Sequence, residues 1–189
     1  AEEAFGQLSQ PALTADYVST ATAGLADALN AALNMPVAST DGQEQWYQLH
    51  SLRAPDRYVS VSEAAGTVTG DETAAAYARS QWKFVKRSDN TFDIVNRKHG
   101  SYLSPASSYN TAISTTASQP SNGWTVSYAS TPGCYIVSSG EVQLNQTQAA
   151  QQYKIYNWSA QSNKGTDRTD AGCQFYINEA PEPIEEPKP

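Results

Sequence analysis

The sequence predicts an all-β domain built from three copies of one four-strand unit and preceded by a helix. Short segments of alternating apolar and polar residues are separated by turn residues such as Asp89-Asn90 and Pro132-Gly133, a pattern typical of strands joined by tight turns. Apolar and aromatic residues also return at nearly constant intervals through residues 45–178, which indicates internal repeats. Both ends differ from this middle in composition, so we expect one core domain with appendages.

Each strand of the unit can be matched in all three copies. The matched positions are Leu49, Ile94 and Ile136 in the first strand, Val59, Leu103 and Leu144 in the second, Val68, Ile113 and Ile155 in the third, and Trp82, Trp124 and Phe175 in the fourth. Successive copies are 41 to 45 residues apart at these positions, except that the last step in the fourth strand is 51 residues. The third copy therefore carries an insertion just before its last strand.

Three such copies would form a β-trefoil, a six-stranded barrel closed at one end by three hairpins. Each unit alone buries too few apolar residues, so the copies are stabilised only by packing around a common axis. Closure of the barrel also removes exposed sheet edges. We expect the repeats at about residues 45–85, 90–128 and 133–178. The expected inward-facing residues are Leu49, Val59, Val68, Trp82, Phe84, Ile94, Leu103, Ile113, Trp124, Val126, Ile136, Leu144, Ile155, Phe175 and Ile177.

The two ends of the chain predict a helix and a linker. Between about residues 14 and 34, apolar residues such as Val18, Leu25 and Leu29 recur at a spacing of three or four, which indicates an amphipathic helix within the N-terminal segment 1–44. Its apolar stripe would pack on the trefoil or belong with an upstream domain. Residues 180–189 contain four prolines, so the segment 179–189 is expected to be an extended linker to adjacent domains of a longer chain.

The distribution of charge argues against some classes of partner. Residues 1–44 carry six acidic and no basic side chains, residues 45–178 carry nine acidic and eleven basic ones, and residues 179–189 carry four acidic and one basic. A nearly neutral domain lacks the clustered Lys and Arg that nucleic acid requires. No apolar run is long enough to span a membrane. Many Tyr, Trp, Ser, Thr, Asn and Gln and a single Met favour an extracytoplasmic location: secreted, periplasmic or at the cell surface.

The sequence predicts no active site, metal site or cofactor. His50 and His99 are the only histidines. His50 follows an inward strand position, where alternation predicts the barrel surface, and His99 precedes Gly100 in a predicted turn, where we expect it to be solvated. No hydrolase, zinc-protease or phosphate-loop motif occurs. Cys134 and Cys173, the only cysteines, form either a disulfide or two buried thiols.

One known family is similar to the repeat. The run from Gln81 to Ser104 resembles the ricin-type β-trefoil lectins, in which a strand with Gln and Trp precedes a polar turn, a hydrophobic strand and a Tyr-Leu or Cys-Leu strand. The family's Gln-x-Trp motif places Gln two residues before Trp, whereas these positions here hold Glu44, Ser80 and Asn122. The resemblance implies a lectin-like, carbohydrate-binding module whose partner is a glycan or polysaccharide.

Sugar sites in small β-domains combine an aromatic side chain, which stacks on the sugar ring, with Asp, Asn or Gln side chains that bind its hydroxyl groups. The alternation that buries Ile155 directs Tyr156 and Trp158 to the opposite face of their strand. The loop of the second copy and the insertion of the third supply the remaining polar and aromatic groups. The candidate carbohydrate-binding residues are Trp158, Tyr109, Asn110, Asn163, Asp167 and Asp170.

A second candidate surface is basic. Five cationic side chains cluster around the strand and turn that open the second copy: Lys83, Lys86, Arg87, Arg97 and Lys98. They form either a patch for an anionic glycan or the solvated face of a hairpin whose other face is buried. The second interpretation is favoured because the lysines alternate with inward aromatic residues.

Three functions remain consistent with the sequence. The leading hypothesis is a non-catalytic carbohydrate-binding module of a larger extracytoplasmic protein, either a glycan-processing or a cell-surface one. The alternative is a structural or protein-docking β-trefoil that binds no sugar, which the altered Gln-x-Trp positions favour. A third hypothesis is a protease inhibitor, which would need a protruding loop, and only residues 157–173 could supply one.

Overall fold

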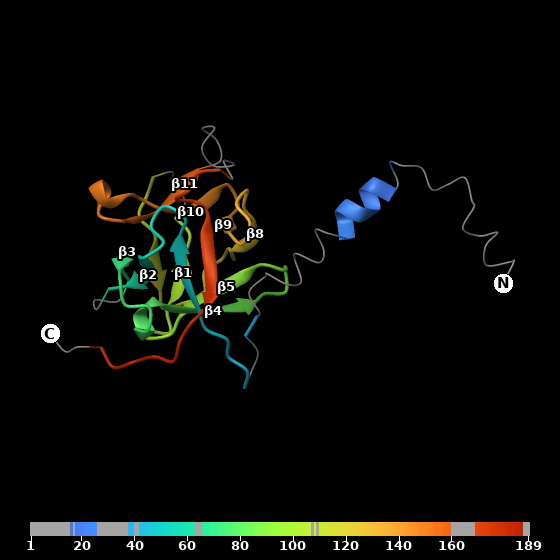
Figure 1. Cartoon of the computed structure of the whole chain (residues 1–189). Helices are drawn as coiled ribbons and strands as arrows, with labels where there is room; N and C mark the ends of the chain where they lie inside the picture. The colour runs from blue at the N-terminus through green and yellow to red at the C-terminus, as the bar shows by residue number, and fades with distance from the viewer. Residues whose placement is uncertain are drawn as a thin grey trace, which may run out of the picture. The chain divides into compact units, whose positions relative to one another are not determined.

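The computed structural model of the chain describes residues 16, 18–25, 38–39, 42–62, 66–106, 108, 110–159 and 169–186. The chain divides into two compact units, Ala1–Met35 and Pro36–Pro189. The first contains a helix over residues 16 and 18–25, and the second contains the labelled strands of Figure 1. No helix among the described residues is long and apolar enough to cross a membrane.

Six strands of the second unit close into a barrel. Antiparallel pairs connect them in the order β1, β4, β5, β8, β9 and β12, and β12 pairs again with β1. Between β5 and β8 the link is one bridge, in which Phe92 and Trp124 exchange two backbone hydrogen bonds of 2.8 Å. These are the first and fourth strands of each copy: β1 (Tyr47–Ser51), β4 (Gln81–Lys86), β5 (Phe92–Asn96), β8 (Thr125–Tyr128), β9 (Tyr135–Ser139) and β12 (Phe175–Glu179).

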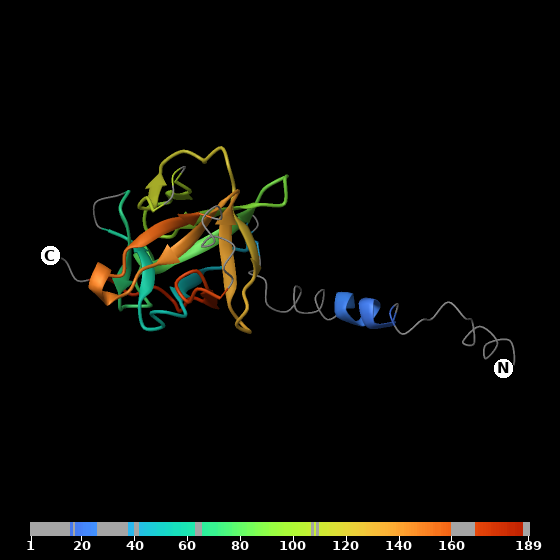
Figure 2. The ribbon, with the colours of Figure 1, turned by 90° about the horizontal axis from the view of Figure 1, so that it is seen from above.

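The second and third strands of each copy pair as a hairpin. The pairs are β2 with β3, β6 with β7, and β10 with β11. The connection between β10 and β11 carries the short 3₁₀-helix η2, which lies at the edge of the domain in two perpendicular views (Figures 1 and 2). The bounds are β2 (Tyr58–Val61), β3 (Val68–Glu72), β6 (Tyr102–Ser104), β7 (Ser114–Thr116), β10 (Val142–Gln146), β11 (Ile155–Ser159), η1 (Ala78–Ser80) and η2 (Ala149–Gln151).

Two matched hydrogen bonds show that the copies are equivalent. The buried indole N–H of Trp82 donates to the carbonyl oxygen of Val59 over 2.8 Å, and that of Trp124 donates to the carbonyl oxygen of Leu103, also over 2.8 Å. Donors and acceptors both occupy matched positions of the first two copies. The third copy has Phe175, which is fully buried but has no N–H to donate. The internal repeat predicted from the sequence is confirmed.

The core contains nearly all of the predicted inward residues. Fourteen of the fifteen are buried, and the exception is Ile177, which is only half-buried. β12 pairs with β9 at Phe175 alone, whereas all five of its residues pair with β1. Beyond Phe175 the strand therefore has a neighbour on one side only, and the prediction for Ile177 was wrong because sequence alternation cannot show where a barrel strand loses one partner.

Of the helix predicted over residues 14–34, the structure describes residues 16 and 18–25. Its described residues are all exposed, including Val18 at 50% and Leu25 at 70%. The apolar side chains of this stretch are therefore not buried, and the helix is not clearly amphipathic. Residues 26–34 of the predicted helix lie outside the described residues.

The Pro-rich segment is bonded to the domain as far as Glu186. The side-chain amide of Gln81 donates to the carbonyl oxygen of Pro181 over 2.9 Å. The carboxylate of Glu186 lies 3.6 Å from Arg79 and 2.6 Å from Lys98, so one acidic side chain joins the first two copies. Residues 179–186, the described part of the predicted linker 179–189, thus follow the surface of the trefoil.

Candidate functional site

Three of the predicted site residues line a single pocket. Asn110, Trp158 and Asp170 surround a cavity of about 490 Å³, a size within the range of small-molecule sites. The remaining lining residues are Arg53, Asn145, Thr147, Gln148, Gln151 and Tyr156. Tyr109, Asn163 and Asp167, the other predicted residues, lie outside the described residues. The pocket belongs to the third copy and defines our candidate site.

The hairpin β10–β11 supplies an aromatic wall. Alternation along β11 buries Ile155 and Asn157 and leaves Tyr156 and Trp158 half-exposed on the other face, as the sequence predicts. Asn145 of β10 lies directly opposite Tyr156 in the sheet register, so its amide shares the face of the two rings. Two aromatic side chains and one amide therefore line the cavity.

A hydrogen-bond network holds Asp170 at the opposite side. Both carboxylate oxygens accept from the Arg53 guanidinium over 3.0 Å. The Oδ1 atom also accepts from the Asn145 side-chain amide over 3.2 Å and from the Gly172 backbone N–H over 2.8 Å. Among the described residues, Arg53 is the partner that bonds Oδ2, so this oxygen keeps capacity to accept a ligand hydroxyl. Asp170 is thus positioned before any ligand arrives.

Arg53 reaches the pocket because Gly172 has no side chain. A Cβ atom at position 172 would lie 2.3 Å from Nη1 of Arg53. That nitrogen donates to the carbonyl oxygen of Gln146 over 3.1 Å, which fixes the guanidinium beside Asp170. The first copy in this way completes a pocket of the third copy.

Asn157 ties the loop of the second copy to β11. This fully buried side chain accepts from the backbone N–H of Thr111 over 2.7 Å and donates to the carbonyl oxygens of Ala106 and Ser108. The backbone N–H of Asn110 donates to the Asn157 carbonyl oxygen over 3.0 Å. Asn110 has a φ of 56°, a left-handed conformation that Asn tolerates well, and it thereby reaches the rim of the pocket.

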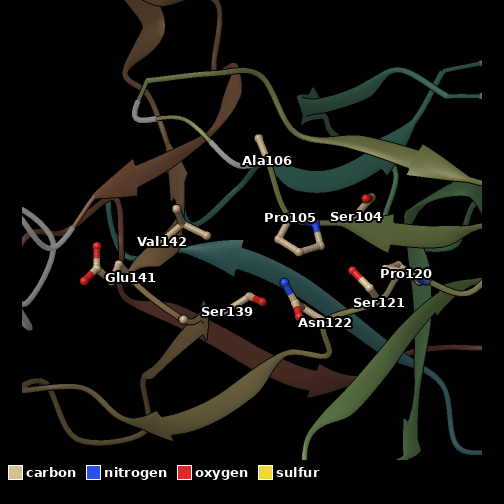
Figure 3. Close-up of a pocket in the computed structure, with 10 residues that line it drawn as sticks. Ser104, Pro105, Ala106, Pro120, Ser121, Asn122, Ser139, Glu141 and Val142 are labelled. Carbon is tan, nitrogen blue, oxygen red and sulfur yellow. The ribbon is translucent and has the colours of Figure 1, made fainter.

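Two further pockets occupy corresponding places in the other copies. Each lies between the end of the copy's second strand and the segment before its fourth strand. The second copy's pocket, of about 430 Å³, is shown in Figure 3 and is lined by Ser104, Pro105, Ala106, Pro120, Ser121, Asn122, Ser139, Gly140, Glu141 and Val142. The first copy's pocket, of about 330 Å³, is lined by Ser60, Val61, Ser62, Thr69, Asp71, Glu72, Thr73 and Arg79.

The three pockets differ in chemistry. The short side chains of Figure 3 include no aromatic ring, and neither do those of the first copy's pocket. Asp71 stands three residues after Val68, as Trp158 stands three after Ile155, so an acidic side chain replaces the aromatic one. Arg79 there is held by Glu72 at 2.6 Å. The third copy therefore has the pocket in which aromatic and polar side chains meet.

Most cations of the basic cluster contact partners within the protein. Lys83 pairs with Glu44, Lys98 with Glu186 and Arg87 with Asp93. Arg97 donates to the side-chain oxygen of Gln81 over 2.8 Å and covers the ring of Trp46. Four of the five cations are thus engaged within the protein, which favours the structural interpretation of this surface.

His50 is buried, and the prediction of a surface position was wrong. Its side chain is 9% exposed and lies between Tyr58 and Tyr176, whose ring centroids are 5.5 and 5.1 Å away. The Nε2 atom meets the side-chain amide of Asn178 at 3.1 Å. Burial lowers the pKa of His50. Outward positions of a barrel strand can be covered by neighbouring aromatic side chains, and strand alternation alone does not reveal this.

Other reactive groups are not assembled into a centre within the described part of the chain. Cys134 and Cys173 are buried free thiols, so the second of the two alternatives is confirmed. The thiol of Cys173 accepts from the Asn145 amide over 3.1 Å, and burial raises the pKa of Cys134. His99 is half-buried rather than solvated. Among the described residues no group of three His, Cys, Asp or Glu side chains could hold a metal ion.

Sequence reasoning missed several residues of the pocket. Asn145 follows the matched inward Leu144, so strand alternation could have identified it as outward-facing. Gln148 and Gln151 lie in a turn rich in Gln and Ala and have no distinctive signal. Arg53 is 117 residues away from Asp170, and a contact of this range leaves no local pattern in one sequence.

Comparison with known proteins identifies the fold. No family model and no curated protein matches the chain. Among solved structures, the Macrolepiota procera ricin B-like lectin in complex with lactose is similar with a TM-score of 0.60 at 13% identity, over 76% of this chain and 99% of that one. The fold is a β-trefoil, shared with this lectin. At this identity the likeness establishes the architecture alone, and the pocket has to be judged from its own residues.

Two other similar structures differ in how much of their own chain the likeness covers. The designed three-fold symmetric protein ThreeFoil has a TM-score of 0.58 at 14% identity, over 70% of this chain and 97% of that one. A GlcNAcα1-4Gal-releasing endo-β-galactosidase from Clostridium perfringens has a TM-score of 0.54 at 14% identity, over 76% of this chain but 35% of that one. A fold similar to this one thus occurs both as a whole chain and as part of a larger one.

Proposed function

We propose that the chain is a non-catalytic carbohydrate-binding module that takes a glycan in the pocket of its third copy. The observation that carries the proposal is the combination of Tyr156 and Trp158 on one wall with Asn145 and Asp170 beside them. Aromatic faces stack on the C–H groups of a pyranose ring, while amide and carboxylate groups bind its hydroxyls. The other two trefoil pockets have no aromatic side chain.

The module is proposed to belong to a larger extracytoplasmic protein, either a glycan-processing or a cell-surface one. The Pro-rich segment near Glu186 supports a connection to further domains. The endo-β-galactosidase supports it as well, since the similar region is 35% of that chain. The lectin similar to this trefoil was solved with lactose, and we therefore propose galactose-containing glycans as the first ligands to test.

A glycan array followed by calorimetry on selected variants tests this proposal. We expect Trp158→Ala to weaken the binding of any array hit about 5- to 30-fold, because a stacked aromatic ring contributes about 1 to 2 kcal/mol. Asn122→Ala, in the pocket of Figure 3, is the matched control and should leave the affinity unchanged. Equal losses in both variants would place the sugar elsewhere.

If the wild-type protein bound no glycan on a broad array, the proposal would be contradicted. This outcome would favour the alternative, a structural or protein-docking trefoil, which is supported by Glu44, Ser80 and Asn122 in place of the Gln of the Gln-x-Trp motif. The protease-inhibitor hypothesis rests on the loop 157–173, and residues 160–168 of this loop lie outside the described residues. Incubation with common serine and cysteine proteases tests it directly.

A further inference from the structure

The face of β11 that bears Trp158 and Tyr156 continues to Lys154, the residue just before the strand. Trp158, Tyr156 and Lys154 occupy every second position, and the residues between them, Ile155 and Asn157, are buried. Successive side chains on one face of a strand are about 6.6 Å apart. The row therefore places two rings and then one ammonium group at intervals on the order of the length of one sugar ring.

A second cavity lies directly beyond Tyr156. It measures about 620 Å³, and Tyr156 lines both this cavity and the candidate pocket. Lys154 and Ala112 border it as well, as do Thr67, just before β3, and Asp71 on the outer face of β3. It is larger than the candidate pocket, and it has no role in the site described above.

The second cavity also neighbours the pocket of the first copy. Thr69 and Asp71 line both. The third copy's pocket, the second cavity and the first copy's pocket, which has a volume of about 330 Å³, therefore lie in series. Tyr156 marks one junction and the outer face of β3 marks the other.

A close backbone approach holds the two walls in place. A Cβ atom at Gly70 would lie 2.3 Å from the carbonyl oxygen of Tyr153, so the absence of a side chain lets β3 approach the start of β11. The fully buried amide of Gln146 donates to the Gly70 carbonyl oxygen over 2.6 Å. The walls of the second cavity are set by backbone packing, so this cavity exists before a ligand binds.

We propose that these cavities form one groove that binds an extended oligosaccharide, with one end in the Trp158 pocket and the following sugars over Tyr156 toward β3. The Lys154 ammonium and the Asp71 carboxylate are exposed and supply a hydrogen-bond donor and an acceptor for ring hydroxyls. The inference rests on the proposed function and adds to it a preference for glycan chains over single terminal sugars.

Calorimetric titration with oligomers of Galβ1-4GlcNAc tests the groove. We expect the wild-type protein to bind the tetrasaccharide about tenfold more tightly than the disaccharide. Repetition of the unit alone would give about twofold. Ala112→Trp, at an exposed position, would fill the second cavity. It should reduce the gain to twofold or less while leaving the disaccharide affinity unchanged.

A second variant tests the groove independently in case Ala112→Trp does not fold. Lys154→Ala combined with Asp71→Ala removes two exposed side chains, and it should also reduce the tetrasaccharide affinity and spare the disaccharide. Asn122→Ala, in the pocket of Figure 3, should change neither affinity.

The outcomes separate the two proposals. Binding of both oligomers with equal affinity, lost in Trp158→Ala, would overturn the groove and leave the pocket intact. A tenfold gain that survives both groove variants would also overturn it. Absence of binding at every length would count against the sugar pocket and the groove together.

Discussion

The equivalence of the copies predicts matched costs for two tryptophan substitutions. Trp82 and Trp124 are fully buried, and each indole donates a 2.8 Å hydrogen bond to a carbonyl oxygen at a matched position. Replacing either by Phe removes the donor and leaves the carbonyl oxygen of Val59 or Leu103 buried without it. The third copy already has Phe175 at the corresponding position.

The expected cost is similar for both variants. A buried carbonyl that loses its hydrogen-bond partner costs about 1 to 3 kcal/mol, and the smaller ring leaves a cavity that adds about 1 kcal/mol. We therefore expect Trp82→Phe and Trp124→Phe each to lower the free energy of unfolding by about 3 kcal/mol. Trp46→Phe is the control, since Trp46 is half-exposed, and it should cost less than about 1 kcal/mol.

Equilibrium unfolding in guanidinium chloride measures these differences, with the slope of the transition expected to stay constant. The reasoning would be refuted if the two buried sites differed by more than about 1.5 kcal/mol. It would also be refuted if both cost no more than Trp46→Phe. In either case the matched hydrogen bonds would not be equivalent parts of one repeated core.

Three further predictions concern polar side chains. Gln146→Leu should lower the free energy of unfolding by about 3 kcal/mol, because Gln146 accepts from the Ser51 N–H over 3.0 Å and donates to a buried carbonyl; a loss below 1 kcal/mol in denaturant titration would refute this. Burial lowers the pKa of His50 from 6.5, so its contribution to stability is complete above pH 6.5 and decreases as the pH falls toward the folded-state pKa. The melting temperature of His50→Gln should accordingly approach that of the wild type between pH 7 and pH 5, and a constant difference would count against it. Glu186→Ala should cost about 1 kcal/mol in thermal unfolding, because it removes partly exposed ion pairs to Arg79 and Lys98, and an unchanged melting temperature would show that the segment is held by its backbone alone.

The repeat made most of the fold predictable from one sequence. Matched positions such as Leu49, Ile94 and Ile136 report burial directly, because the same environment recurs three times and alternation fixes the face of each strand. The predictions for Ile177 and His50, which rested on the same alternation, were wrong. One lies where β12 has a single neighbouring strand, and the other is covered by two tyrosines.

The candidate site was predictable only in part. Trp158 and Asp170 could be identified because strand parity and loop position are local properties. Arg53 could not, since its place beside Asp170 depends on the closure of the barrel and on the missing side chain of Gly172. The groove beyond Tyr156 depends on the approach of β3 to β11 at Gly70, which one sequence does not specify.

A crystal structure of the protein soaked with lactose tests the central claim most directly. Our account predicts density for one sugar ring against Trp158 or Tyr156 in the third copy's pocket, with hydroxyls within hydrogen-bond distance of Asp170 or Asn145. A well-ordered sugar in the aromatic-free pocket of Figure 3, and none beside Trp158, would contradict it.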